Sequence, residues 1–553
     1  MFIRAKKRGT RTYLQIVENR REGKKVVQTV RATLGRLDVL VSTGKLDSLL
    51  RSGLRFSEKL RVLDAHSRDK CTTTDTSRVG AVLLCEKLWR DCRIGAVLSS
   101  FLAGRSYQYS LERVVFIVVL SRLFSPGSDR STLRWMRDYA IAGAAGLDLH
   151  HFYRTMGWLG EPVRGGEESK REFGKNTVDL YRKDVIEEAL FSLRRDLFSQ
   201  MELVFFDTTS LYFEGAGGES IGQRGKSKDH RPDLRQMVVG VVLDDSGNPV
   251  CSELLPGNTA DVKSLIPVAQ RLRERFGVEE ICIVADRGMI SATTIEEIES
   301  MEGWHYILGA RMRNAKEVRD EVLSHGGRFR EVRAPRTTSK DPAPLKVKEV
   351  MVEDHRYVIC LNEEEAQKAR HMRASIVESL QQQLQSSDKD LVGNKGYRRY
   401  LKSNGNHFEI DKDKIDEEKR YDGKYVLRTD TTMSAELVAL KYKQLWTVET
   451  IFRTMKSTLE TRPIFHKCDD TIRGHVFCSF LALVLRKRLM DRLEAKGHDM
   501  EWAHIVQDVN EMLEVTVEHG GKQFTIRTEP KGVAGKVMQA AGVALPPVLR
   551  ENK

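Results

Sequence analysis

The sequence has no apolar stretch long enough to cross a bilayer, which takes about 20 consecutive apolar residues in a helix. The best candidate, residues 114–120, is much shorter and is soon followed by Arg122. The basic residues 4–8 have no apolar core after them, so we expect no secretory signal. These absences favour a protein without a membrane partner.

Paired cysteines are also absent. The eight cysteines are scattered singly with no Cys-x-x-Cys spacing, which argues against a zinc ribbon or a disulfide framework. Cys85, Cys282 and Cys360 lie within apolar runs, where cysteine behaves as a small hydrophobe. The reducing cytoplasm is therefore the expected location.

What the chain does have is length and positive charge. Its 553 residues exceed what one hydrophobic core supports, so two to four domains are expected. The net charge is +13, and basic residues gather in residues 4–31, 224–235 and 311–348. Clustered cations gain affinity for a polyphosphate by counterion release. Charge alone fits either a nucleic-acid-binding protein or an ordinary basic surface.

Changes in periodicity divide the chain into segments. Residues 1–65 predict a small β unit, in which strands at 12–17 and 26–30 flank a basic turn. This hairpin fits a contact with a DNA backbone, although a solvated loop tip explains the same residues. Residues 76–198 instead show helical spacing, and we interpret them as a helical DNA-binding domain. The helices expected there span residues 80–90, 111–124, 132–139 and 185–198, with a polar linker at 157–174.

Residues 199–310 change character and predict an α/β sheet. Strands are expected at 203–207, 237–243, 249–255, 280–286 and 304–310, and helices at 262–276 and 292–301. This is the element order of a ribonuclease H-like catalytic domain. Residues 311–434 contain too much secondary structure for a loop, so we expect a β-rich insertion there. Residues 435–495 then resume the catalytic fold, and the tail, 496–553, predicts a helix and a short hairpin.

Three carboxylates stand out by their positions. Asp207 and Asp286 each end an apolar run, and Glu449 lies in a long helical pattern. An Asp at a strand end is by itself more often a turn former or a helix cap. Here, however, small residues follow Asp207, while Arg287 and Gly288 follow Asp286. Two strands and one helix can bring the three side chains together as a cage for hard divalent cations.

The helical pattern at 435–461 has one polar and aromatic face. The residues that share this face, three or four positions apart, are Tyr442, Leu445, Glu449, Arg453 and Lys456. An exposed helix with a Glu449–Arg453 ion pair would account for the charges alone. It would not account for the two strands upstream that end on aspartate.

The spacing of Tyr442, Glu449 and Lys456 closely resembles the YREK motif of the hairpin-forming DDE transposases of bacterial insertion sequences. Leu445 occupies the Arg position of that motif, and Arg453, two turns further on, could take over the phosphate contact of that Arg. Further blocks similar to this group span residues 206–209, 225–234, 256–261 and 284–288. Together they extend the similarity from about residue 201 to residue 485, and their common order makes it specific.

The resemblance implies a DDE reaction centre. Asp207, Asp286 and Glu449 would be catalytic and would hold two Mg²⁺ ions roughly 3.5–4 Å apart, with Mn²⁺ able to substitute. Contacts with DNA are implied for Tyr442, Arg453, Lys456, Arg287, Trp446, Lys228, His230 and Arg231. The last three lie in a loop that a solvated turn explains equally well. Trp304 and Trp446 are candidates for stacking on a flipped base, although Trp304 fits a strand core better.

The implied function is transposition of an insertion sequence. Such a protein would bind double-stranded DNA at the terminal inverted repeats and at the target, as at least a dimer in the synaptic complex. It would be cytoplasmic and nucleoid-associated in a bacterium. Two alternatives stay open: a ribonuclease H-like nuclease that cuts without joining, and a domesticated DNA-binding protein with a dead site. The intact set of three carboxylates disfavours the second alternative.

Overall fold

The computed structural model describes residues 1–22, 25–54, 57, 72–163, 170–173, 176–194, 203–278, 280–333, 343–386, 399–404, 407–519 and 521–552. The chain divides into two compact units. One consists of residues 1–83, 138–140 and 501–553, and the other of residues 84–137 and 141–500. Among the described helices, none is both long enough and apolar enough to span a membrane.

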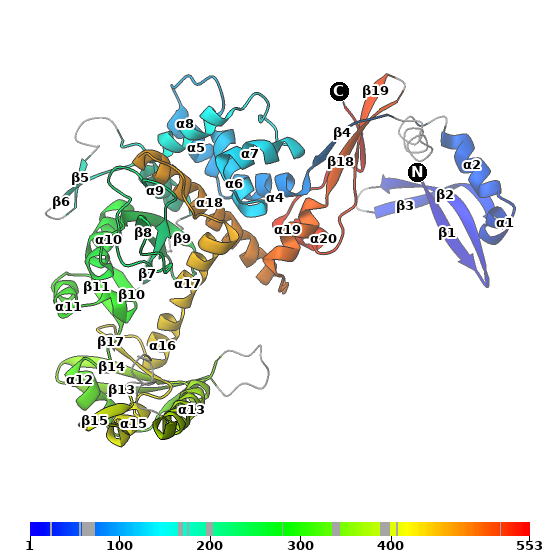
Figure 1. Ribbon diagram of the computed structural model, residues 1–553. Coiled ribbons are helices and arrows are strands. Elements are labelled where there is room, and N and C mark those ends of the chain that lie inside the picture. The colour runs from blue at the N-terminus through cyan, green and yellow to red at the C-terminus, as the bar shows by residue number, and fades with distance from the viewer. Residues whose placement is uncertain are drawn as a thin grey trace. The chain divides into compact units, whose positions relative to one another are not determined.

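The first unit contains two antiparallel sheets (Figure 1). The expected N-terminal hairpin is present as β2 (Arg11–Glu22) and β3 (Lys25–Arg36). A strand that the sequence did not predict, β1 (Phe2–Arg8), pairs with the other edge of β2. The second sheet, in the order β20–β19–β18–β4, consists of β4 (Thr72–Arg78), β18 (Leu513–His519), β19 (Lys522–Arg527) and β20 (Leu549–Glu551). The helices of this unit are α1 (Leu37–Ser42), α2 (Lys45–Leu54), α19 (Trp502–Asn510) and α20 (Ala534–Ala541).

The second unit begins with a helical layer. Its centre is α6 (Leu111–Phe124), which is buried along its length because apolar residues surround the whole helix. Two helices, α8 (Leu149–Gly160) and α18 (Asp469–Glu494), pack against α6 and against each other. Gly160 and Gly474 lie at their crossing, where an added side chain would meet the opposite backbone. The other elements of the layer are α4 (Gly80–Asp91), α5 (Ile94–Leu102), α7 (Asp129–Trp135), a turn at Met136–Asp138, the hairpin β5 (Lys170–Phe173) and β6 (Asn176–Asp179), and α9 (Arg182–Arg194).

Two helices of this layer, α5 and α8, were not expected from the sequence. The expected linker at 157–174 overlaps the end of α8, and its residues 164–169 and 174 lie outside the described residues. The last expected helix, 185–198, is present as α9 up to Arg194, and the rest of that range also lies outside them.

A nine-stranded mixed sheet forms the body of the second unit. Its order is β12–β13–β14–β17–β11–β10–β7–β8–β9. The strands are β7 (Leu203–Tyr212), β8 (Gln236–Leu243), β9 (Pro249–Pro256), β10 (Ile281–Ala285), β11 (Trp304–Gly309), β12 (Arg330–Arg333), β13 (Leu345–Val352), β14 (His355–Leu361) and β17 (Lys424–Thr429). β7, β10 and β11 run parallel to one another, whereas β8 runs antiparallel to both of its neighbours. The mixed α/β class expected from the sequence is therefore present.

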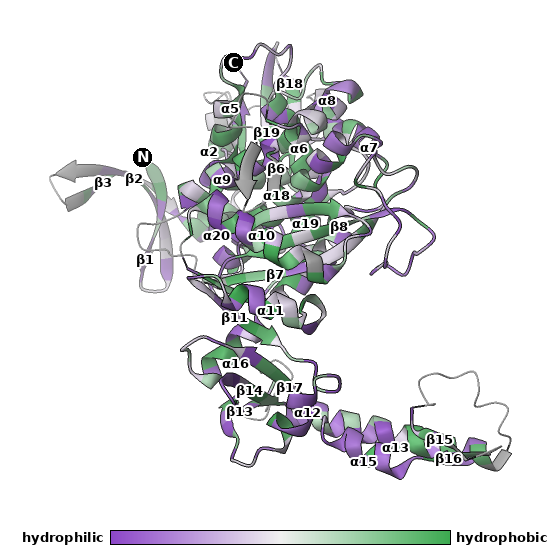
Figure 2. Ribbon diagram, turned by 90° about the vertical axis from the view of Figure 1, so that its left-hand side faces the viewer, coloured by the Kyte–Doolittle hydropathy of each residue, from purple (hydrophilic) through white to green (hydrophobic). Residues whose placement is uncertain are grey.

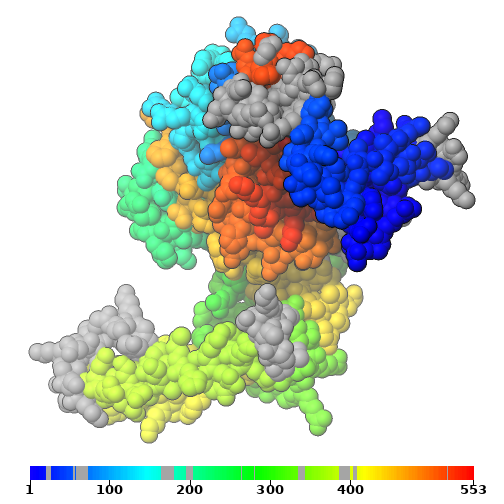
Figure 3. Space-filling model, turned by 90° about the vertical axis from the view of Figure 1, so that its right-hand side faces the viewer, coloured from blue at the N-terminus to red at the C-terminus, as the bar shows by residue number. Residues whose placement is uncertain are grey.

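Four strands of residues 311–434, β12, β13, β14 and β17, belong to this main sheet. β17 pairs with β11 and β14, so this segment extends the main sheet at one edge. Its own apolar cluster includes Met312, Val318, Tyr357 and Tyr421. A long helix, α13 (Glu363–Ser386), extends from it together with the hairpin β15 (Leu401–Asn404) and β16 (His407–Ile410), as Figures 2 and 3 show. The remaining helices of this segment are α12 (Lys316–Asp320) and α15 (Lys412–Lys419), with a turn at Val322–Ser324.

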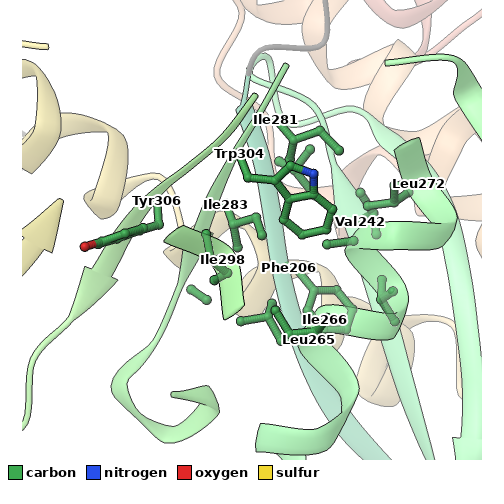
Figure 4. Close-up of a cluster of buried hydrophobic side chains, with 14 of the residues drawn as sticks. Phe206, Val242, Leu265, Ile266, Leu272, Ile281, Ile283, Ile298, Trp304 and Tyr306 are labelled. Atoms are coloured by element: carbon green, nitrogen blue, oxygen red, sulfur yellow. The ribbon is translucent and has the colours of Figure 1, made fainter. Parts of the chain in front are cut away.

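The two faces of the sheet are covered by different helices. On one face, α10 (Asp261–Phe276) and α11 (Ala292–Glu299) bury a cluster that includes Phe206, Ile283 and Trp304 (Figure 4). α17 (Trp446–Arg453) lies against β7 and β8. Because successive side chains of a strand point to opposite faces, Asp207 lies on the face opposite Phe206 and its apolar cluster.

Candidate active site

Asp207 and Asp286 are neighbours on adjacent parallel strands. The register pairs Phe205 of β7 with Val284 of β10, and continuing it by two residues sets Asp207 opposite Asp286. Asp286 directly follows the last residue of β10, as expected. Asp207 does not end its strand, and that expectation was wrong. β7 continues to Tyr212 because residues 208–212 pair with β8.

Burial raises the pKa of Asp207 to about 6. The Lys228 ammonium and the Thr208 backbone N–H lower this pKa, while the carboxylates of Asp261 and Asp286 raise it. The Thr208 N–H donates to Asp207 Oδ1 at 2.7 Å, and Lys228 Nζ lies 4.0 Å from the same oxygen. Asp207 is therefore a half-buried carboxylate in a negatively charged environment with one lysine beside it.

Asp261 anchors that lysine and was missed by the sequence reasoning. Lys228 Nζ lies 3.2 Å from Asp261 Oδ2 and donates to the Thr208 carbonyl and hydroxyl oxygens at 2.7 Å and 2.9 Å. The Thr208 hydroxyl in turn donates to Asp261 Oδ1 at 2.7 Å. The available signal was that Asp261 closes the block 256–261, one of those that resemble the transposase group.

The helix expected at 435–461 is interrupted twice. α16 (Ala435–Lys443) ends before a turn at 444–445, α17 follows, and a π-helical turn spans Thr454–Thr458. Glu449 lies on α17 and is exposed. Leu445, at the motif position otherwise held by Arg, is buried, so no cation reaches the surface from that position.

The carboxylates fit a hard divalent cation only in part. Asp207 and Asp286 offer oxygen ligands side by side, and the raised pKa of Asp207 reflects uncompensated negative charge that a cation would neutralise. Within the described residues, however, no three Asp, Glu, His or Cys side chains are grouped closely enough to hold a metal ion. The structure thus sets the two aspartates side by side, and the part of Glu449 in metal binding stays a prediction.

Tyr442 contacts one of these carboxylates directly. Its hydroxyl donates to Asp286 Oδ1 at 3.0 Å, and its ring stacks on Tyr425 of β17 with centroids 5.8 Å apart. Burial and the neighbouring Asp286 carboxylate raise the pKa of Tyr442, so the phenol keeps the proton that it donates.

Lys456 contacts Asp229, in the loop that also contains Lys228, His230 and Arg231. Its ammonium donates to Asp229 Oδ1 at 2.7 Å, and the Asp229 side chain is only 4% exposed. Burial lowers the pKa of Lys456, and the contact with Asp229 opposes this effect. The adjacent His230 has a φ of 57°, a left-handed conformation that is uncommon for a residue with a side chain. Arg231 is exposed and pairs with Asp233 at 2.9 Å.

The remaining candidates for DNA contact face solvent. Arg287 and Arg453 are exposed, and the Trp446 side chain is 64% exposed. Trp446 lines a cavity of about 760 Å³ whose other walls include Arg333, Leu437, Leu440, Lys441 and Lys443. Trp304 is buried in the apolar cluster under the sheet, which excludes it from stacking on a base.

Comparison with known families agrees with this geometry. Residues 198–485 match the family model described as the transposase DDE domain, and this range contains Asp207, Asp286 and Glu449. Residues 3–67 match the model described as the N-terminal domain of the IS1634 family transposases. No curated protein matches the chain. Since the first match alone covers more than half of the 553 residues, the chain belongs to the DDE transposases of insertion sequences.

Proposed function

We propose that this transposase binds the terminal inverted repeats of its element, cuts the DNA there and joins the freed ends to target DNA. The reaction would use Asp207, Asp286 and Glu449 with two divalent ions, Mg²⁺ or Mn²⁺. Because two ends must be held together, the active complex would contain at least two copies of the chain.

The observation that carries this proposal is the proximity of Asp207 and Asp286, which the register of β7 and β10 sets opposite each other and whose charges interact. α17, which carries Glu449, lies against β7. Five neighbouring strands of the sheet follow the order β9–β8–β7–β10–β11, and among these five β8 alone runs opposite to the others. This arrangement supports a ribonuclease H-like core. When bound, the ions would activate the attacking oxygen and stabilise charge on the leaving oxygen. The chain's part is to present the carboxylates in fixed positions and to align the DNA.

Alignment of the DNA is assigned to exposed cations and to one indole. Arg287 and Arg453 would contact phosphates, which fix the position of a duplex without reading its sequence. Arg287 lines a cavity of about 300 Å³ together with Arg311, Arg313 and Asn314, so several cationic side chains border one place. Trp446, exposed beside Lys441 and Lys443, offers a surface for stacking an unpaired base.

Tyr442 and Lys456 would act close to the same DNA, although each is bonded to a carboxylate in the structure described. Lys228, His230 and Arg231 belong to a loop that borders Asp207 through Lys228. We also assign DNA contacts to the hairpin within residues 1–65 and to the helical segment 76–198, where basic residues are available.

The deciding experiment incubates the purified protein with a duplex that ends in its own inverted repeat, with a target plasmid and with Mg²⁺. The expected products are cleaved ends and covalent joints to the plasmid, both lost in Asp207→Asn while binding to the duplex is retained. Cleavage without joints would instead establish a nuclease. Binding without cleavage by the wild type would establish a DNA-binding protein with a dead site.

A further inference from the structure

Tyr442 lies in a confined place between three elements. Its hydroxyl donates to Asp286 after β10, its ring stacks on Tyr425 of β17, and Gly309 at the end of β11 lies directly beneath it. A Cβ added at Gly309 would lie 2.5 Å from the Tyr442 hydroxyl oxygen, well inside van der Waals contact. The absence of a side chain at Gly309 is thus what leaves room for the hydroxyl.

We infer that Tyr442 is a positioning residue for Asp286, held in place by the ring of Tyr425 and by the space at Gly309. Asp286 itself is exposed and follows the end of its strand, so the strand pairing does not fix its side chain. The hydrogen bond from Tyr442 supplies the missing restraint on Oδ1. In this way the segment 311–434, which contributes β17, takes part in arranging the reaction centre.

The inference deepens the proposed function, since it takes Asp286 to be a metal ligand. Groups that hydrogen-bond to a ligating side chain orient it and make it a better ligand, and losing one typically costs about 10- to 100-fold in metal affinity. A tyrosine with a purely structural role would affect folding but not the affinity for a cation.

The test titrates the full-length protein with Mn²⁺ and follows the free ion by electron paramagnetic resonance. Tyr442→Phe should raise the Kd for Mn²⁺ by about tenfold or more, because it removes only the hydroxyl. Gly309→Ala should have a similar effect by displacing that hydroxyl. In the Tyr442→Phe background, Gly309→Ala should raise the Kd for Mn²⁺ further by less than about twofold. The reason is that the next atoms, Arg287 N and Tyr442 Cζ, lie 3.2 Å and 3.3 Å from the added Cβ and need only small shifts.

Two matched control variants make the same kinds of substitution away from the contact between Tyr442 and Asp286. Tyr306→Phe removes a tyrosine hydroxyl that donates to another carboxylate, Glu299, at 2.5 Å. Gly326→Ala adds a Cβ at a glycine with no atom within 4 Å of it. Both should leave the Mn²⁺ affinity unchanged. Tyr425→Leu should weaken it by about two- to tenfold, the value of an aromatic pair.

The outcomes are distinct. Wild-type affinity in Tyr442→Phe, alongside loss of Mn²⁺ binding in Asp286→Asn, overturns the inference and leaves the proposed function intact. The inference is also overturned if Gly309→Ala raises the Kd for Mn²⁺ by the same factor in the wild type and in Tyr442→Phe. Absence of Mn²⁺ binding in the wild type, or unchanged binding in Asp286→Asn, overturns the metal assignment on which both rest. If Gly309→Ala does not fold, judged by circular dichroism, the affinity of Tyr442→Phe decides alone.

Discussion

Arg275 of α10 is the centre of a buried ion cluster that joins α9 to the nine-stranded sheet. Its side chain is 2% exposed, and its guanidinium contacts Glu187 and Glu188 at 2.9 Å each and Glu253 of β9 at 3.3 Å. The full cluster sets three cations against four carboxylates: Lys183, Arg271 and Arg275 against Asp184, Glu187, Glu188 and Glu253.

Arg275→Met keeps much of the side-chain volume and removes the cation that contacts the most carboxylates. Glu187, whose side chain is 0% exposed, would retain only Lys183 at 3.6 Å as a cationic neighbour. Removing one partner of a buried ion pair costs about 3–5 kcal/mol, and we expect a loss in that range. Proton uptake limits the loss, because burial already raises the pKa of Glu187.

The loss of stability in Arg275→Met depends on pH through the protonation of Glu187. In Arg275→Met the folded-state pKa of Glu187 rises further above its ordinary value of 4.5. The folded state then binds a proton that the unfolded state releases, so the variant regains stability as the pH falls through the raised pKa. The difference from the wild type should therefore be smaller at pH 5 than at pH 8.

Native-state hydrogen exchange of the peptides in α9 and α10 measures this loss without assuming two-state unfolding of a long chain. A loss of about 3–5 kcal/mol speeds exchange by about two to four orders of magnitude. Arg273→Met alters a more exposed residue on the same helix, and its exchange rates should stay within about tenfold of those of the wild type. Adding Glu187→Gln to Arg275→Met should restore part of the protection. An acceleration of less than about tenfold in Arg275→Met would refute the reasoning.

Three further predictions concern other sites. The buried His475 has a pKa well below 6.5. Stability should therefore fall by about 1.4 kcal/mol per pH unit below pH 6.5, where only the unfolded state takes up its proton. His475→Gln should reduce that slope, measured as urea midpoints against pH. Trp446→Ala should weaken binding of single-stranded DNA by about 5- to 150-fold, since stacking contributes about 1–3 kcal/mol per base. In anisotropy titrations, Phe465→Ala, which alters another exposed aromatic residue, should not have this effect. Lys456→Met should destabilise the protein by about 1–3 kcal/mol, because the buried Asp229 loses the donor to Oδ1 and keeps Arg462 at 3.4 Å from Oδ2. Limited proteolysis should detect this loss of stability, and adding Asp229→Asn to Lys456→Met should largely restore the resistance to protease.

Elements with strong local patterns could be predicted from the sequence. α6 has the expected bounds, and the strands and helices between β8 and β11 differ from expectation by only a few residues. In each, an apolar run or a clear period is bounded by turn residues, so local chemistry determines the element. The expected cluster of Asp207 with Asp286 follows from the same strands.

Elements that depend on distant partners could not be predicted. β1 is basic and exposed, and only its pairing with β2 makes it a strand. β4 is polar throughout, and its partner β18 lies more than 400 residues away in the sequence. The pairing of β17 with β11 is also non-local. Sequence periodicity carries no information about such partners, so it predicts β-rich content in residues 311–434 but not the sheet that β17 joins.

The three carboxylates show why part of a site is accessible to sequence reasoning and part is not. Asp207 and Asp286 are related by strand register, which two adjacent parallel strands fix to the residue. Glu449 depends on the phase of a helix, and that phase is altered by the turn at 444–445 and by the π-helical turn at Thr454–Thr458. Each such departure from 3.6 residues per turn rotates the residues on either side of it relative to one another. A face drawn over 435–461 as one regular helix therefore cannot predict how Glu449 lies relative to Asp207 and Asp286, and the role of Glu449 in the site stays a prediction.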